Sequence, residues 1–116
     1  MNITHTLEEQ ICKIKLEGQL ALDAVKVAKD YIQPLLENTQ IRLMIFDCAK
    51  VVFVDSKGVS LIMITNLALK QREAHFALVG LNEKIMEVFH LSGLVSHIRI
   101  CASEQEAIKS IPNYGN

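Results

Sequence analysis

Residues 55 to 58, Asp-Ser-Lys-Gly, are the part of this chain whose residue types and spacing best suit chemistry. They follow an apolar segment, Val51 to Val54, and a long apolar stretch begins at Gly58. This pattern predicts that Ser56 stands at the start of a helix, where backbone N–H groups lack partners and the macrodipole is positive. A hydroxyl there can cap the helix, act as a nucleophile, or carry a phosphate that the free N–H groups stabilise.

A hydrolytic role for Ser56 is disfavoured by the residues around it. Serine hydrolases of the α/β type place the nucleophile in a Gly-x-Ser-x-Gly turn and need a His base later in the chain. Here Asp55 and Lys57 flank Ser56, and the later His90 and His97 come without a matching motif. The chain is therefore expected not to be an enzyme, and capping and phosphorylation remain as the two roles for Ser56.

Asp47 and the cysteines are the other candidates for reactive groups. Asp47 ends an apolar segment, as the phosphoacceptor of a response-regulator receiver does, but Glu8-Glu9 comes too early to supply the acidic pair that such a domain needs for Mg²⁺. Cys12, Cys48 and Cys101 are widely spaced, with no Cys-x-x-Cys pair and no His at ligand spacing. Buried thiols in a reducing compartment are expected, and neither a metal nor a cofactor is predicted.

Length, composition and charge limit the possible classes of protein. The 116 residues, half of them hydrophobic, predict one domain over residues 1–116 with enough apolar material for one core. The formal net charge is −1 and no Lys/Arg run is present, so nucleic-acid binding is not expected. The longest apolar stretches are too short to span a bilayer and the N-terminus is polar. We therefore expect a cytoplasmic protein with no direct membrane insertion.

Hydrophobic periodicity predicts alternating strands and helices around these residues. Strands are expected within residues 2–7, 11–16, 42–46, 75–79 and 95–101. Helices are expected within residues 20–33, 58–73, 83–91 and 104–111. Pro34 should end or kink the first helix near Gln33, and Asn82 and Ser103 should be N-caps. The order β-β-α-β-α-β-α-β-α predicts an α/β fold with a layered sheet.

The expected helix over residues 58–73 is apolar around most of its circumference. Its apolar residues are Val59, Leu61, Ile62, Met63, Ile64, Leu67, Ala68 and Leu69. A helix of this kind is either buried on nearly all sides or exposes apolar surface to a partner.

Five short motifs in this order resemble those of STAS domains, and specifically the stand-alone anti-sigma-factor antagonists of bacteria. They are Leu16-Glu17-Gly18-Gln19-Leu20, the strand ending in Asp47, Val51-x-Phe53-Val54-Asp55-Ser56-x-Gly58, Leu91-Ser92-Gly93-Leu94 and Ser103-x-x-Glu106-Ala107. Each motif is weak alone, but together they cover nearly the whole chain. The resemblance implies a STAS-type α/β fold, with a mixed β-sheet of about four to five strands and four helices packed largely on one side.

The resemblance also implies a function. In the family, the Ser directly after this Asp is phosphorylated by a kinase that is itself the anti-sigma factor, and Ser56 is the matching residue. The implied protein is a regulatory binding module for an anti-sigma serine kinase, switched off by phosphorylation at Ser56, with a PP2C-type phosphatase as a further partner. The expected partner-binding residues are Asp23, Asp55, Ser56, Lys57, Gly58, Val59, Leu61 and Ile62. The alternative is a non-phosphorylated STAS scaffold subunit of a membrane transporter or stress-signalling complex, in which Ser56 only caps the helix.

Three places depart from the usual pattern of the family. Lys57 stands where many members have a second Ser, and its ammonium can pair with a phosphate or tune recognition of the partner. Ala21 stands where an acidic residue is common, with Asp23 two residues further on. Cys48-Ala49-Lys50 replaces the more usual Leu-Ser-x.

Overall fold

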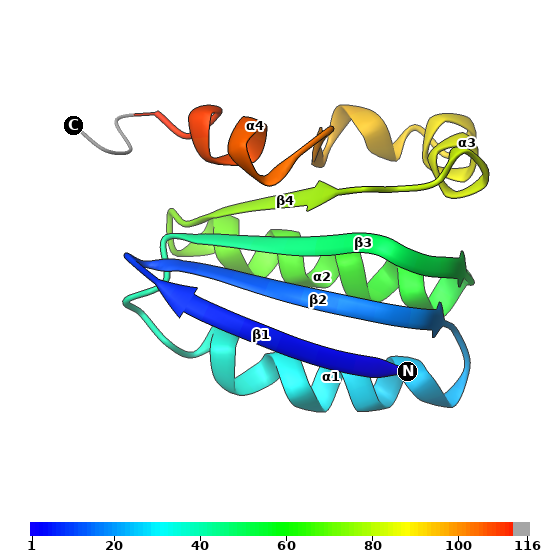
Figure 1. The fold of residues 1–116 in the computed structure, drawn as a ribbon, viewed down its shortest axis with the longest axis horizontal. Coiled ribbons are helices and arrows are strands. Elements are labelled where there is room, and N and C mark those ends of the chain that lie inside the picture. The colour runs from blue at the N-terminus through cyan, green and yellow to red at the C-terminus, as the bar shows by residue number, and fades with distance from the viewer. Residues whose placement is uncertain (113–116) are drawn as a thin grey trace.

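Residues 1–112 are described by the computed structural model of this chain, which contains five strands and four α-helices within them (Figure 1). The strands are β1 (Asn2–Glu8), β2 (Ile11–Leu20), β3 (Leu43–Val54), β4 (His75–Val79) and β5 (Arg99–Cys101). The α-helices are α1 (Asp23–Leu36), α2 (Ser56–Gln71), α3 (Glu83–Leu91) and α4 (Glu104–Lys109). A 3₁₀ turn, η1 (Leu94–Ser96), lies between α3 and β5. The predicted order of strands and α-helices is confirmed.

The strands form one mixed sheet in the order β1-β2-β3-β4-β5. β1 and β2 are an antiparallel hairpin, whose turn residues Glu9 and Gln10 have φ of 51° and 71°, as a tight hairpin turn of type I′ requires. The other neighbouring strands pair in parallel. Since Leu20 pairs with Val54, the ends of β2 and β3 lie together at one edge, where α1 and α2 begin.

Three of the four α-helices cover one face of this sheet. The larger core cluster joins α1, α2 and α3 to that face, with Ile32, Ile62 and Phe89 among its buried members. The smaller cluster lies on the opposite face, where Ala107 of α4 packs with residues of β3, β4 and β5. Figure 1 shows α1 and α2 behind the sheet and α4 beside β4. The prediction of four helices packed largely on one side is confirmed.

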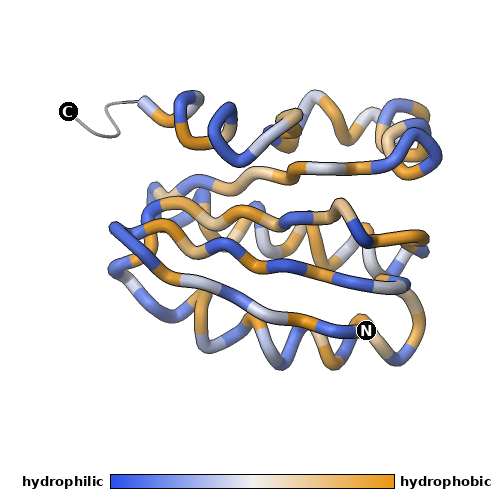
Figure 2. The backbone as a smooth tube through the Cα atoms, in the orientation of Figure 1, coloured by the Kyte–Doolittle hydropathy of each residue, from blue (hydrophilic) through white to orange (hydrophobic). Residues whose placement is uncertain are grey.

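Hydropathy along the strands follows this layering (Figure 2). Apolar and polar residues alternate along β2, whose Cys12, Ile14 and Leu16 are buried. β3 is instead buried on both faces from Leu43 to Phe46, as predicted for a central strand. Within residues 1–112 no helix combines the length and the apolar character needed to cross a membrane.

The strand before Ser56 is longer than predicted. We expected a strand ending near Asp47 and a separate apolar segment, whereas β3 continues from Leu43 to Val54. The polar interruption is a bulge: Lys15 pairs with Asp47 and Glu17 with Lys50, so β3 contains one more residue than β2 there. Asp47 Oδ1 accepts a hydrogen bond from the Ala49 N–H at 3.1 Å, which closes the bulge.

Other predicted boundaries were also wrong. β2 continues to Leu20, so α1 begins at Asp23 and not at Leu20. α1 continues past Pro34 to Leu36, because Pro34 lies in the last turn and its missing N–H interrupts few helical bonds. The Glu37 N–H donates to the Gln33 carbonyl at 3.2 Å and ends the helix. The last strand is only Arg99–Cys101, because the residues before it form η1.

Candidate functional site

Asp55 links the starts of α1 and α2. It is the N-cap of α2: its Oδ1 accepts a hydrogen bond from the Gly58 N–H at 2.9 Å. Its Oδ2 accepts from the Leu22 N–H, also at 2.9 Å. Leu22 has φ of 52°, a left-handed conformation that is unfavourable for a Leu. One carboxylate therefore fixes the first turn of α2 and supports a strained turn before α1.

Ser56 is the first residue of α2 and not its cap. The residue is exposed, and within residues 1–112 its hydroxyl has no hydrogen-bond partner. Of the two roles left open for Ser56, capping is contradicted, because β3 extends to Val54 and Asp55 takes the N-cap position. In the part of the chain that the structure describes, the hydroxyl is consequently unpaired, at the positive end of a helix of 16 residues.

Gly58 allows the start of α2 to approach the end of β2 closely. A Cβ at this position would lie 2.2 Å from the Leu20 carbonyl oxygen and 2.8 Å from Val54 Cγ1. Both distances are shorter than those that real Cβ atoms show. The first contact is with a backbone atom, which cannot rotate away, so a side chain does not fit here. Gly58 is thus required for the packing that holds Asp55 and Ser56 in place.

The eight predicted partner-binding residues differ in exposure. Three are exposed: Asp23, Ser56 and Lys57. Two are partly buried: Asp55 and Val59. Three belong to the interior: Gly58, Leu61 and Ile62. The interior residues expose little surface, because α2 turns them toward the sheet; they position the exposed residues.

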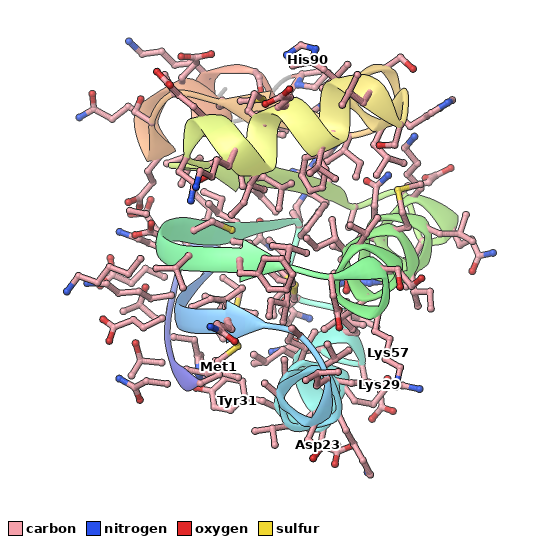
Figure 3. The ribbon with its side chains drawn as sticks, turned by 90° about the vertical axis from the view of Figure 1, so that its right-hand side faces the viewer. Met1, Asp23, Lys29, Tyr31, Lys57 and His90 are labelled. Atoms are coloured by element: carbon pink, nitrogen blue, oxygen red, sulfur yellow. The ribbon has the colours of Figure 1, made fainter. Side chains whose placement is uncertain are left out.

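A hollow of about 550 Å³ lies between α1 and α2, and its lining includes Lys57, the residue after Ser56; we call it the α1–α2 hollow. It is lined by Leu22, Asp23, Val25, Lys26, Lys29, Asp30, Lys57, Ser60, Leu61 and Ile64. Figure 3 shows Asp23 and Lys29 on α1 and Lys57 toward α2 on this side of the molecule. The hollow therefore brings the predicted residues Asp23 and Lys57 together, although they are far apart in the sequence.

Exposed apolar side chains of α1, of α2 and of the turn before α1 were missed as individual site residues; of those named here, Leu22 and Ile64 line the α1–α2 hollow. Ile64 and Leu67 of α2 are 57% and 56% exposed, and Val27 of α1 is 57% exposed. Leu22 is 71% exposed. For Ile64 and Leu67 the signal was the apolar circumference of α2, and of its two predicted explanations, an exposed apolar surface is the correct one.

The other candidates for reactive groups have structural roles. All three cysteines are buried, as predicted, and burial raises the pKa of Cys12 to about 11 and that of Cys48 to about 12. Both are therefore neutral thiols near neutral pH and poor nucleophiles. Within residues 1–112 no group of three or more His, Cys, Asp or Glu side chains is arranged to hold a metal ion.

The Asp55 carboxylate predicts a pH dependence of stability. The hydrogen bonds from Gly58 N–H and then Leu22 N–H lower the pKa of Asp55 below its ordinary value of 3.8. Stability from a lowered carboxyl pKa is present above the ordinary value and is lost as pH falls through the native value. Asp55→Ala should lower Tm at neutral pH and flatten the decline of Tm below about pH 4. Circular dichroism melts across the acid range measure both effects.

Asp30→Ala is the matched control for this prediction. Asp30 is exposed and pairs only with Lys26 on the same helix, so its removal should change Tm little. If Asp55→Ala and Asp30→Ala gave the same profile of Tm against pH as the wild type, Asp55 would not support the turn.

Comparison with known proteins agrees with this geometry. The curated anti-sigma-B factor antagonist of Staphylococcus aureus (strain NCTC 8325 / PS 47) is 24% identical over 94 residues, which cover 81% of this chain and 86% of the relative. A solved structure from Thermotoga maritima, provisionally described as an anti-sigma factor antagonist, has a TM-score of 0.87 at 18% identity, covering 94% of this chain and 93% of that one.

The phosphorylated form of SpoIIAA, a Bacillus cell fate determinant, has a TM-score of 0.72 at 24% identity, covering 93% of this chain and 97% of that one. At such identities these two structures show a common fold. The model of the STAS domain family matches residues 2–107. Since this match includes the sheet, all four α-helices up to Ala107 and the Asp55–Gly58 turn, the chain belongs to the STAS domain family.

Proposed function

We propose that this chain is a single-domain, cytoplasmic regulatory module that binds an anti-sigma serine kinase and is switched off by phosphate on Ser56. The observation that carries the proposal is an exposed hydroxyl at the start of α2, which has no hydrogen-bond partner among residues 1–112 and belongs to a helix with exposed apolar side chains. The names of the relatives support it: one is an anti-sigma-B factor antagonist, and another was solved in a phosphorylated form. The module acts by binding and carries out no catalysis itself.

The start of α2 suits a phosphate on electrostatic grounds. A phosphoserine carries about −1.5 to −2 charges, and the helix N-terminus is positive. The Gly58 N–H is already bonded to Asp55, whose carboxylate repels a nearby phosphate. Lys57 is the adjacent cation that offsets this repulsion, which gives a role to this departure from the family pattern. Phosphorylation therefore changes the charge of the surface without requiring the domain to refold.

The partner surface that we propose is the α1–α2 hollow with its exposed apolar rim. Leu22 and Ile64 provide the exposed apolar contact area, and Lys57 and Lys29 provide charge at the edge. A kinase that covers this surface also covers Ser56, as transfer of a phosphate to its hydroxyl requires. After transfer, the complex must desolvate a doubly charged group, which favours dissociation. A phosphatase of the PP2C type would restore the hydroxyl and the binding-competent form.

Ile64 tests whether this surface binds the kinase. Ile64→Asp should weaken the complex at least about tenfold, because a charge replaces an apolar contact that becomes buried on binding. The thermal stability of the free protein should change little, since Ile64 is 57% exposed. Isothermal titration calorimetry with the cognate kinase measures the affinity.

Leu91→Asp is the matched control for Ile64→Asp. Leu91 ends α3 and is 81% exposed, and it is absent from the lining of the α1–α2 hollow. Its substitution should leave the affinity unchanged. Equal affinities for both variants and the wild type would show that the kinase binds elsewhere.

A further inference from the structure

A second hollow lies at the end of the sheet opposite to Ser56, where β4 and β5 begin. It has a volume of about 370 Å³ and is lined by Asn66, Lys70, Ala74, His75, Phe76, Ser96, His97, Ile98 and Arg99. We call it the β4–β5 pocket. Ser56 begins α2, whereas Lys70 lies in its last turn, so the helix separates the two sites by most of its length.

The polar lining of the β4–β5 pocket is strongly biased toward positive charge. Four side chains, Lys70, His75, His97 and Arg99, are basic or can become cationic. Among the residues that line it in the described part of the chain, none carries a carboxylate. The α1–α2 hollow differs, since Asp23 and Asp30 accompany its lysines and Lys26 is paired with Asp30.

Within residues 1–112, the side chains of Lys70, His75, His97 and Arg99 have no hydrogen-bond or ion-pair partner. The ion pairs within residues 1–112 are Lys13–Glu104, Lys26–Asp30 and Lys50–Glu17, and none involves the pocket. Burial, followed by the charges of Arg99 and Arg42, lowers the pKa of His75. The charge of Arg99 thus disfavours protonation of His75, and an anion in the pocket would offset this unfavourable interaction and the unpaired charges of Lys70 and Arg99.

The backbone around the pocket is fixed before any ligand binds. The Asn66 side chain, 7% exposed, donates to the His97 carbonyl at 3.1 Å and ties the loop before β5 to α2. The Ser96 hydroxyl donates to the Gly93 carbonyl at 2.9 Å within the same loop. The backbone of residues 93 to 97 is therefore held in place without a ligand, which reduces the entropy cost of binding.

We propose that the β4–β5 pocket binds an anion of the diphosphate type through Lys70, His75, His97 and Arg99. Phosphate oxygens suit this set of donors, because Arg presents a planar fork, Lys a point charge and His a ring N–H. A volume of about 370 Å³ exceeds that of a single small ion and leaves room for two linked phosphates. The inference does not depend on the proposed function of Ser56.

The test is a titration of the ¹⁵N-labelled protein with sodium pyrophosphate, followed by NMR at constant ionic strength. Saturable shifts should centre on the amides of Ser96, His97 and Arg99, and the double variant Lys70→Gln with Arg99→Gln should bind at least about tenfold more weakly. The control double variant Lys26→Gln with Lys57→Gln alters the α1–α2 hollow and should bind pyrophosphate as the wild type does.

A parallel titration with ADP separates free diphosphate from a nucleotide as the source of the anion. Equal affinities for the two would assign recognition to the diphosphate alone, and tighter binding of ADP would add a contribution from the nucleoside. The proposal is overturned if neither compound gives saturable shifts at this pocket, if the shifts centre on the α1–α2 hollow, or if the Lys70 and Arg99 double variant, shown to be folded by its spectrum, binds as tightly as the wild type.

Discussion

Ser56→Asp should weaken the complex with the cognate anti-sigma kinase by roughly a thousandfold, which corresponds to about 4 kcal/mol. The carboxylate places a fixed charge where the phosphate would be, and the kinase must desolvate it to cover the α1–α2 hollow. The stability of the free protein should not fall, because Ser56 is exposed, its side chain makes no hydrogen bond within the described residues 1–112, and it begins a helix that favours an anion there. Calorimetric titration measures the affinity, and a thermal melt measures the stability.

Ser103→Asp is the matched control for this effect. Ser103 is exposed and caps α4, so Asp preserves the cap and adds the same charge at another helix start, next to the smaller core cluster. Its affinity for the kinase should equal that of the wild type. If Ser56→Asp also bound as tightly as the wild type, the phosphate switch would fail and a permanent scaffold would be the better account of this domain.

Gly58→Ala should reduce the free energy of unfolding by about 3 kcal/mol or more. The added Cβ would stand 2.2 Å from the Leu20 carbonyl oxygen, and this contact is with backbone, which cannot rotate away as a side chain can. Relief requires α2 to move away from β2, which would also weaken the hydrogen bonds from Leu22 and Gly58 to Asp55. Urea unfolding followed by circular dichroism measures the loss.

Ser60→Ala serves as the comparison for Gly58→Ala. It lies in the same helix and is exposed, so its unfolding free energy should stay within about 0.5 kcal/mol of the wild type. Similar stabilities for the two variants would show that the start of α2 adapts easily to a side chain, against the close packing described for this turn.

Most of the fold could be predicted from the sequence, because the local sequence patterns agree with the tertiary structure. The caps at Asn82 and Ser103 hold as predicted, with their side chains accepting from the Ile85 and Glu106 N–H groups. The bulge in β3 could not be predicted from the sequence, because Asp47 and the polar residues after it resemble a loop. Only pairing with β2 keeps that segment in the sheet.

The candidate site could be predicted from the sequence only in part. Asp55 and Ser56 are both good N-cap residues, so sequence alone does not decide between them, and a strand that extends to Val54 does. The helix after them is apolar on nearly all sides. Its hydrophobic pattern therefore could not show that Ile62 faces the core and Ile64 faces solvent.

The β4–β5 pocket left no signal in the sequence. Its basic residues come from the end of α2, the start of β4, the turn after η1 and the start of β5. Such residues form no local motif, and parallel pairing of β4 with β5 is what brings them together. Sites of this kind become visible only when the topology is known.

The most direct test of the phosphate switch is to incubate the protein with its cognate kinase and Mg·ATP, map the phosphate by mass spectrometry, and measure the affinity of the product for the kinase. We predict one phosphate, on Ser56, which is absent from Ser56→Ala, and a product that no longer forms the complex. A phosphate on another residue, no phosphate at all, or a phosphorylated protein that binds the kinase as tightly as before would contradict the proposed switch.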